Sequence, residues 1–144
     1  MEQRGYTLIE VIVVIALLGI VLSSINISTK WVQNVQFKTA VRQVEEGLIY
    51  VRQAAVKTGK QYNLYCFSNR VLIRRGVEKP IYTIYLSKGM SIPDNITGKH
   101  LIFRGSMASP KTGTISIIHQ GIKQQADITV YIATGKIAVK YKAL

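Results

Sequence analysis

The sequence predicts an α+β protein in which one long N-terminal helix packs on a small antiparallel β-sheet head. Three observations predict this fold class. An apolar run lies near the N-terminus, an amphipathic helical pattern follows it directly, and short alternating segments fill the second half of the chain. The chain has 144 residues, so its soluble part has room for only a small core, and packing of the sheet on the helix should matter for stability.

The first element is an apolar helix over residues 6–29. Glu10 is the only charged residue between Tyr6 and Thr29, and about 20 apolar residues suffice to cross a bilayer as a helix. A secretory signal is disfavoured, because its apolar stretch is shorter and ends at a small-residue cleavage site. A plain membrane anchor leaves Glu10 unexplained, since an acid at the centre of a membrane helix costs roughly 2.5–3.5 kcal/mol. The sequence therefore predicts a transmembrane helix in which Glu10 has a partner or a function.

The second element continues this helix as an amphipathic segment over residues 30–59. Apolar residues recur there at spacings of three and four, which is typical of a helix with one apolar face. These residues are Phe37, Val41, Val44, Leu48, Val51 and Ala55. Thr58-Gly59 is a plausible stop, so one helix should run from about residue 7 to 58, roughly 75 Å at 1.5 Å per residue. A two-stranded coiled coil would show the same pattern, but the β-rich segment that follows needs a surface to cover.

The third element is a β-rich globular head over residues 60–144. Six short strands are expected at Tyr62–Phe67, Val71–Arg74, Ile81–Leu86, Leu101–Arg104, Thr114–His119 and Ile128–Ile132. A turn at Thr134-Gly135 should lead into a last strand, KIAVKYK, on which the side chains alternate between two faces. Ile137, Val139 and Tyr141 should cover the helix. Lys136, Lys140 and Lys142 should form a stripe in solvent.

The chain shows no pattern typical of an enzyme or a metalloprotein. Its Ser, His and Asp residues form no catalytic motif, and there is no phosphate-binding loop. His100 and His119 are isolated, so neither a metal site nor another cofactor is predicted. Cys66 lies in an alternating strand pattern and is expected to be a small buried apolar side chain.

The strongest motif precedes the apolar run. Arg4-Gly5-Tyr6-Thr7-Leu8-Ile9-Glu10 resembles the prepilin motif of type IV pilins and pseudopilins. The resemblance implies that residues 1–5 are a leader peptide, that prepilin peptidase cuts between Gly5 and Tyr6, and that Tyr6 is then N-methylated. The family usually has Phe at that position. Glu10 matches the family's acid, whose carboxylate can pair with the terminal amine of a neighbouring subunit. That pairing neutralises two costly groups and would register the subunit during assembly.

The closing segment DITVYIATGKIAVK resembles that of minor pseudopilins, and most closely those of competence filaments in Gram-positive bacteria. This implies a minor subunit of a competence pilus-like filament, needed for assembly and DNA uptake in transformation. It would be a single-pass cell-membrane protein with its head outside, at the cell surface in the assembled filament. Its partners would be prepilin peptidase, the membrane and other pilins. The alternative is a subunit of a type II secretion system or of an adhesive type IV pilus.

Charge adds double-stranded DNA as a candidate partner. Nineteen Lys and Arg residues oppose seven Asp and Glu residues, a formal net charge of +12 that suits a polyanion, although a basic surface also simply keeps a protein soluble. Lys136, Lys140 and Lys142 are the candidate DNA contacts. Some pilins of this group bind DNA through a glycine–basic–x–basic pattern in the last hairpin, and Gly135-Lys136-Ile137-Ala138 lacks its second basic residue. No row of exposed aromatic residues that could stack on single-stranded bases is evident in the sequence.

Overall fold

The computed structural model describes residues 7–105, 113–131 and 134–144, with side chains described outside residues 24–28. The chain forms two compact units, residues 1–33 and residues 34–144. One helix, α1 (Leu8–Thr58), contributes to both units. It ends at Gly59, whose φ of 66° is the left-handed conformation that commonly closes a helix. The predicted bounds of the helix, from about residue 7 to 58, are thus confirmed.

The part of α1 in the first unit presents apolar side chains on all sides. Every large apolar residue from Leu8 to Leu22 is exposed, and Glu10 is the one charged residue among them. Exposed apolar surface of this extent marks a site that contacts lipid or other protein chains. Within the described residues, no helix has the length and apolar character required to cross a membrane.

The part of α1 in the second unit has a single buried face. The six predicted seam residues, Phe37, Val41, Val44, Leu48, Val51 and Ala55, are all fully buried. Lys38 and Arg42, between them, are exposed. The 3.6-residue period of the sequence therefore identified the buried face correctly.

Eight strands follow the helix. They are β1 (Tyr62–Phe67), β2 (Arg70–Arg75), β3 (Pro80–Tyr85), β4 (Met90–Ser91), β5 (His100–Phe103), β6 (Gly113–His119), β7 (Gln124–Val130) and β8 (Ile137–Ala143). Every predicted strand is present, although β7 begins four residues before the predicted Ile128, and Ile132 lies outside the described residues. The two-residue strand β4 was not predicted.

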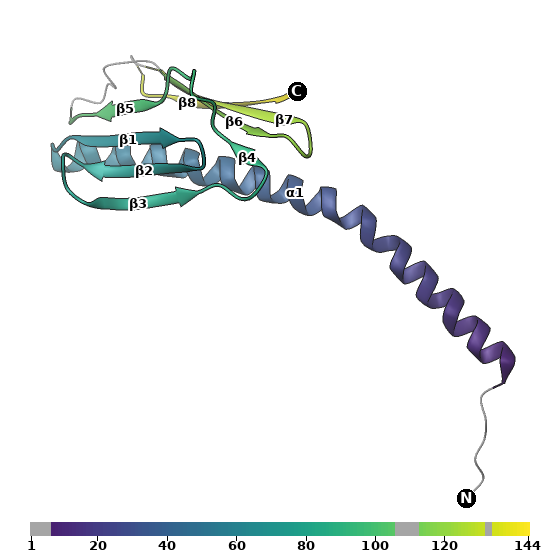
Figure 1. The fold of residues 1–144 in the computed structure, drawn as a ribbon. Helices are drawn as coiled ribbons and strands as arrows, with labels where there is room; N and C mark the ends of the chain where they lie inside the picture. The colour runs from purple at the N-terminus through teal and green to yellow at the C-terminus, as the bar shows by residue number, and fades with distance from the viewer. Residues whose placement is uncertain (1–6, 106–112, 132–133) are drawn as a thin grey trace, which may run out of the picture. The chain divides into compact units, whose positions relative to one another are not determined.

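The strands form two four-stranded antiparallel sheets. Sheet A has the order β3-β2-β1-β5, and sheet B has the order β4-β6-β7-β8. In Figure 1, β1, β2 and β3 lie in front of the second part of α1, and β6, β7 and β8 lie above it. The strands β3 and β8 are edges of their sheets.

One core joins the helix to both sheets. Leu64, Ile73 and Leu101 of sheet A and Ile117 and Ile128 of sheet B are essentially inaccessible to solvent and belong to the same cluster as the helix seam. Burying side chains of this size contributes roughly 1.5–3 kcal/mol each. The predicted packing of the sheet on the amphipathic half of the helix is therefore confirmed, with the strands divided between two sheets.

Candidate assembly and binding surfaces

Glu10 caps the start of α1. Its Oε2 accepts hydrogen bonds from the backbone N–H of Thr7 at 2.8 Å and from the Thr7 hydroxyl at 3.0 Å. This is one half of a capping box, in which a residue in the first turn satisfies the residue that precedes the helix. The negative charge also lies at the positive end of the helix dipole. This contact was not among the predictions, although the spacing Thr-x-x-Glu in the sequence is typical of it.

The predicted cleavage and methylation positions, Gly5 and Tyr6, lie outside the described residues. Thr7, the capping partner of Glu10, is the first residue that the structure describes. In the described part, Glu10 stands at the first turn of a helix that is apolar on every other side. The carboxylate is exposed and retains its second oxygen, Oε1, for another donor.

The C-terminal hairpin has the predicted two faces only in part, because burial along β8 does not alternate and Tyr141 is 53% exposed. Ile137 and Val139 pack against the core, and the Tyr141 ring meets the Phe37 ring edge-on at 6.3 Å between centroids. Lys136, Lys140 and Lys142 are all exposed, as expected. These lysines therefore face solvent while the apolar side of β8 covers the helix.

Lys142 already has an anionic partner. Its Nζ lies 2.6 Å from Oδ2 of Asp127, which also accepts hydrogen bonds from Ser116 and Gln125 on Oδ1. Burial alone would raise the pKa of Asp127, but the hydrogen bonds from Lys142, Gln125 and Ser116 outweigh it and hold the pKa below its usual value. Asp127 thus stays ionised and neutralises one charge of the lysine stripe.

The turn of the hairpin is fastened to α1 by Arg52. Its guanidinium donates to the carbonyl oxygens of Gly135 at 2.9 Å and Thr134 at 3.1 Å. Gly135 has a φ of 58°, and a Cβ there would come within 2.7 Å of Arg52 Nε. The backbone conformation therefore favours glycine, and a Cβ there would displace the Arg52 guanidinium from its present position.

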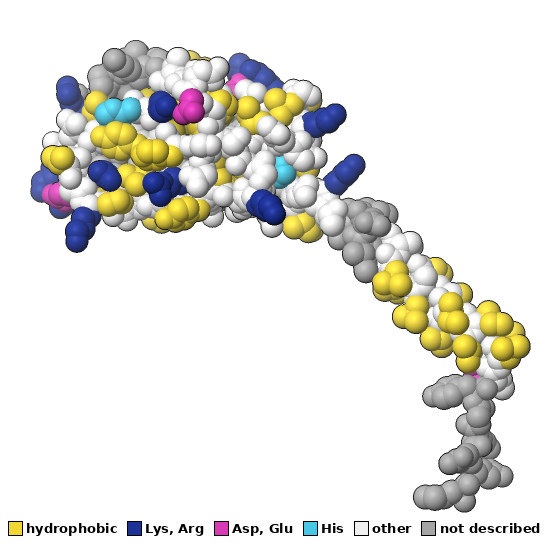
Figure 2. Space-filling model, in the orientation of Figure 1, with side chains coloured by type: hydrophobic (Ala, Val, Ile, Leu, Met, Phe, Trp, Pro, Cys, Tyr) yellow, Lys and Arg dark blue, Asp and Glu magenta, His cyan; other side chains and the backbone are white. Residues whose placement is uncertain are grey.

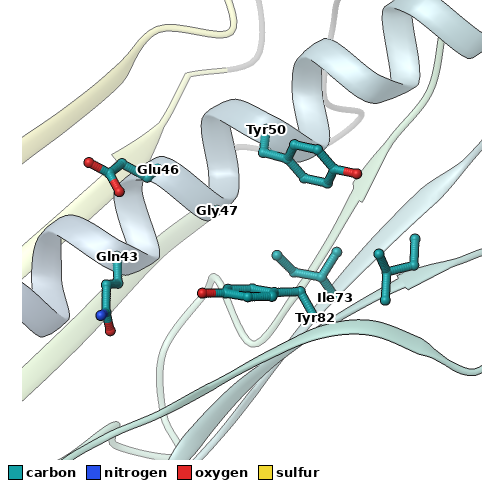
Figure 3. Close-up of a pocket in the computed structure, with 7 residues that line it drawn as sticks. Gln43, Glu46, Gly47, Tyr50, Ile73 and Tyr82 are labelled. Carbon is teal, nitrogen blue, oxygen red and sulfur yellow. The ribbon is translucent and has the colours of Figure 1, made fainter.

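A shallow apolar groove of about 340 Å³ runs between the second part of α1 and the edge of sheet A. Figure 3 shows Tyr50 of α1 facing Tyr82 of β3 across it, with Ile73 at its base. Gly47 allows the close contact, because a Cβ there would lie 3.2 Å from Ile84 Cδ1. The one acid in the lining, Glu46, is paired with Arg42 at 2.9 Å, and no nucleophile–base pair lines the groove.

The side of sheet A that faces away from α1 carries exposed rings that are not evident as a row in the sequence. Phe67 and Tyr85 are 43% and 67% exposed, and both are directly opposite Arg70 in the strand register. The rings come from different strands, so their proximity depends on pairing that the sequence alone does not display. Of the other tyrosines, Tyr62 is in the core, as expected.

The isolated titratable residues form no reactive site. Cys66 is buried, and burial raises the pKa of its thiol to about 12, so it behaves as the small apolar side chain predicted. His119 is buried against Phe37, with ring centroids 6.1 Å apart, and His100 stacks on Tyr65. Across the ranges that the structure describes, no group of His, Cys, Asp or Glu could hold a metal ion.

Comparisons with known proteins identify a sequence motif at the N-terminus and a similar fold. Residues 1–26 match the family described as the prokaryotic N-terminal methylation motif. No curated protein sequence matches the chain.

The fold is similar to those of solved minor pilins. The type IV minor pilin FimU of Pseudomonas aeruginosa is 13% identical, with a TM-score of 0.61 over 76% of this chain and 92% of FimU. A second crystal form of FimU gives a TM-score of 0.56 at 14% identity, over 72% of this chain and 91% of FimU. EpsH, the minor pseudopilin from the type 2 secretion system of Vibrio cholerae, is 14% identical, with a TM-score of 0.53 over 74% of this chain and 95% of EpsH.

The chain thus has an α+β fold like that of the type IV minor pilin FimU, with a long N-terminal helix packed on antiparallel sheets. Its N-terminal methylation motif, over residues 1–26, overlaps the start of that helix.

Proposed function

We propose that the protein is a minor pilin or pseudopilin, a structural filament subunit and not an enzyme. Prepilin peptidase removes residues 1–5 and Tyr6 is methylated. The mature chain is held in the membrane by residues 6–29, with the head outside, until it joins other pilins at the cell surface. The observation that carries this proposal is the coincidence of the methylation motif over residues 1–26 with the minor-pilin fold.

The exposed apolar surface of residues 8–22 supports the membrane step and the filament step alike. Side chains of this kind are stable only in lipid or against other helices. Glu10 gives that surface one anionic point, where the methylated amine of a neighbouring subunit can bind, and methylation keeps that amine charged. Burying the two groups as a pair costs much less than burying either one alone.

Processing tests the class of protein. The full chain is expressed with and without a prepilin peptidase, and the new N-terminus is identified by mass spectrometry. We expect cleavage between Gly5 and Tyr6 and one added methyl group on Tyr6. Gly5→Val should abolish cleavage, while Gly19→Ala, a small change at an open helix position where a Cβ meets no other atom within 4 Å, should leave it intact. A chain that keeps its N-terminus beside an active peptidase would contradict the proposal.

We propose further that the subunit belongs to a competence filament, which takes up DNA during transformation. The hairpin resemblance and the net charge of +12 support this choice. Deletion of the gene should collapse transformation frequency, and the wild-type gene should restore it. Unchanged transformation in a competent host would instead favour the alternative, a type II secretion or adhesive pilus, and the similarity to EpsH makes secretion the first alternative to test.

A further inference from the structure

The side of sheet A that faces away from α1 combines aromatic rings with cations. We propose that this surface, the ring–cation face, binds single-stranded nucleic acid. It is made of Phe67, Arg70, Tyr85, Tyr65, His100 and Arg74. Figure 2, in the orientation in which β1, β2 and β3 lie in front of α1, shows hydrophobic and basic side chains interleaved over these strands.

The first row of the face crosses three strands at one end of the sheet. Arg70 of β2 is directly opposite Phe67 of β1 on one side and Tyr85 of β3 on the other. Directly opposite residues share a face of a sheet, and neighbouring strands are about 4.8 Å apart. The Arg70 guanidinium lies over the Phe67 ring, 5.1 Å from its centroid. The row is therefore ring, cation, ring. Tyr85, at the sheet edge, also borders a hollow beside Thr39 and Gln43 of α1.

The second row adds a preformed stack. Tyr65 of β1 is directly opposite His100 of β5, and their rings are parallel to within 8° with centroids 4.3 Å apart. Arg74 of β2 faces the same way one row further along, because alternate residues of a strand share a face. Aromatic planes and guanidinium groups thus extend over all four strands of the sheet.

The face has no acid of its own. The other residues that point the same way, Asn63, Leu72, Thr83 and Ile102, are uncharged. Two described acids in the segments that connect strands of the head are already paired, Asp94 with Lys99 at 2.9 Å and Glu78 with Arg75 at 2.7 Å. A polyanion that approaches the face therefore meets cations without local repulsion.

The rings decide which polyanion fits. Duplex phosphates need only cations, and the base planes of a duplex are covered by stacking on one another, so that only the base edges in the grooves are open to side chains. A single strand presents free base planes that stack on aromatic rings while its phosphates bind Arg, and such stacking tolerates any sequence. Of the hairpin lysines, Lys142 is held by Asp127. This inference rests on the proposed function for its role in DNA uptake, but the binding itself is a property of the head.

The test measures binding of a fluorescent dT oligonucleotide of about 16 nucleotides to the full-length protein in detergent micelles by anisotropy. The double variant Phe67→Leu/Tyr85→Leu keeps apolar bulk and removes both rings, so it should fold as wild type does. We expect it to bind the single strand about tenfold or more weakly and to bind a duplex of the same length with less than a twofold change. Arg70→Gln should weaken both and reduce the salt slope by about 1.

The matched control is the triple variant Lys136→Gln/Lys140→Gln/Lys142→Gln. Its affinity for the single strand should stay within about threefold of the wild-type value, because it loses only general positive charge. Loss of binding only in this triple variant would overturn the proposal in favour of the hairpin. Equal competition by polyphosphate, an anion without bases, would overturn it in favour of charge alone, and unchanged binding in the ring variant would overturn it outright. Filament incorporation of the ring variant is measured in parallel. If the ring variant enters filaments normally but has lost single-strand binding, the two functions are separate. If the pilin function is wrong, the wild-type protein will not enter filaments either.

Discussion

The two parts of α1 use the same residue types in different ways. From Leu8 to Leu22 every large apolar side chain is exposed, whereas between Phe37 and Ala55 the seam is fully buried and exposed polar residues lie between its members. Both segments consist mainly of residues that a helix tolerates, so helix formation does not distinguish them. The two segments differ in the periodicity of their apolar residues. An all-round apolar surface suits lipid or a bundle of neighbouring helices, while a stripe suits one covering surface.

This difference teaches that the stability of the head should depend on one part of the helix and assembly on the other. The seam joins a core that reaches both sheets. The residues up to and including Gln33 belong to a separate compact unit. Substitutions matched in chemistry but placed in the two parts should therefore have separate consequences.

The largest expected effect comes from shortening a seam leucine. Leu48→Ala removes a fully buried side chain and should lower the free energy of unfolding of the head by about 2–5 kcal/mol. Leu18→Ala, at a residue 57% exposed, should change it by less than about 0.5 kcal/mol. Thermal and denaturant unfolding of the full chain in detergent, followed by near-ultraviolet circular dichroism, compares them. Equal losses from the two variants would mean that the two parts of the helix are not separate in stability.

The sequence predicted the elements better than their arrangement. The helix bounds followed from the apolar period and Gly59, and the strands from alternation. The division into two sheets did not follow, because it depends on pairs such as Leu64 with Leu101, which are far apart in the sequence. The strand β4 is only two residues long and shows no alternation.

The candidate surfaces show the same limit. Alternation placed Lys140 and Lys142 on the solvent side of β8, but the ion pair with Asp127 requires the pairing of β7 with β8. The row of Phe67, Arg70 and Tyr85 likewise requires the register of three strands. Local patterns report which face a residue occupies, and only the tertiary pairing reports its neighbours.

A smaller effect is expected where α1 holds the hairpin through polar contacts. Arg52→Met removes the donors to the carbonyls of Gly135 and Thr134 and should cost about 1–3 kcal/mol. Arg42→Met is the control, because Arg42 makes only an exposed pair with Glu46, and should cost about 0.5 kcal/mol or less. The same unfolding measurement applies. If Arg52→Met were as mild as Arg42→Met, apolar packing alone would hold the hairpin on the helix.

The smallest effect on stability is expected at the start of α1, where assembly is the informative measurement. Thr7→Ala removes the hydroxyl that donates to Glu10 and should weaken the helix start by about 1 kcal/mol or less, without changing the unfolding of the head. Glu10→Gln keeps an oxygen acceptor for the Thr7 N–H but removes the charge. If Glu10 registers the subunit by binding a neighbour's amine, only Glu10→Gln and Glu10→Ala should be lost from sheared filaments, as judged by immunoblot against total protein. If Glu10 serves only to cap the helix, Thr7→Ala and Glu10→Gln should reduce incorporation by similar, small amounts. Normal incorporation of Glu10→Ala would remove both roles, because that variant has neither the charge nor the capping oxygen.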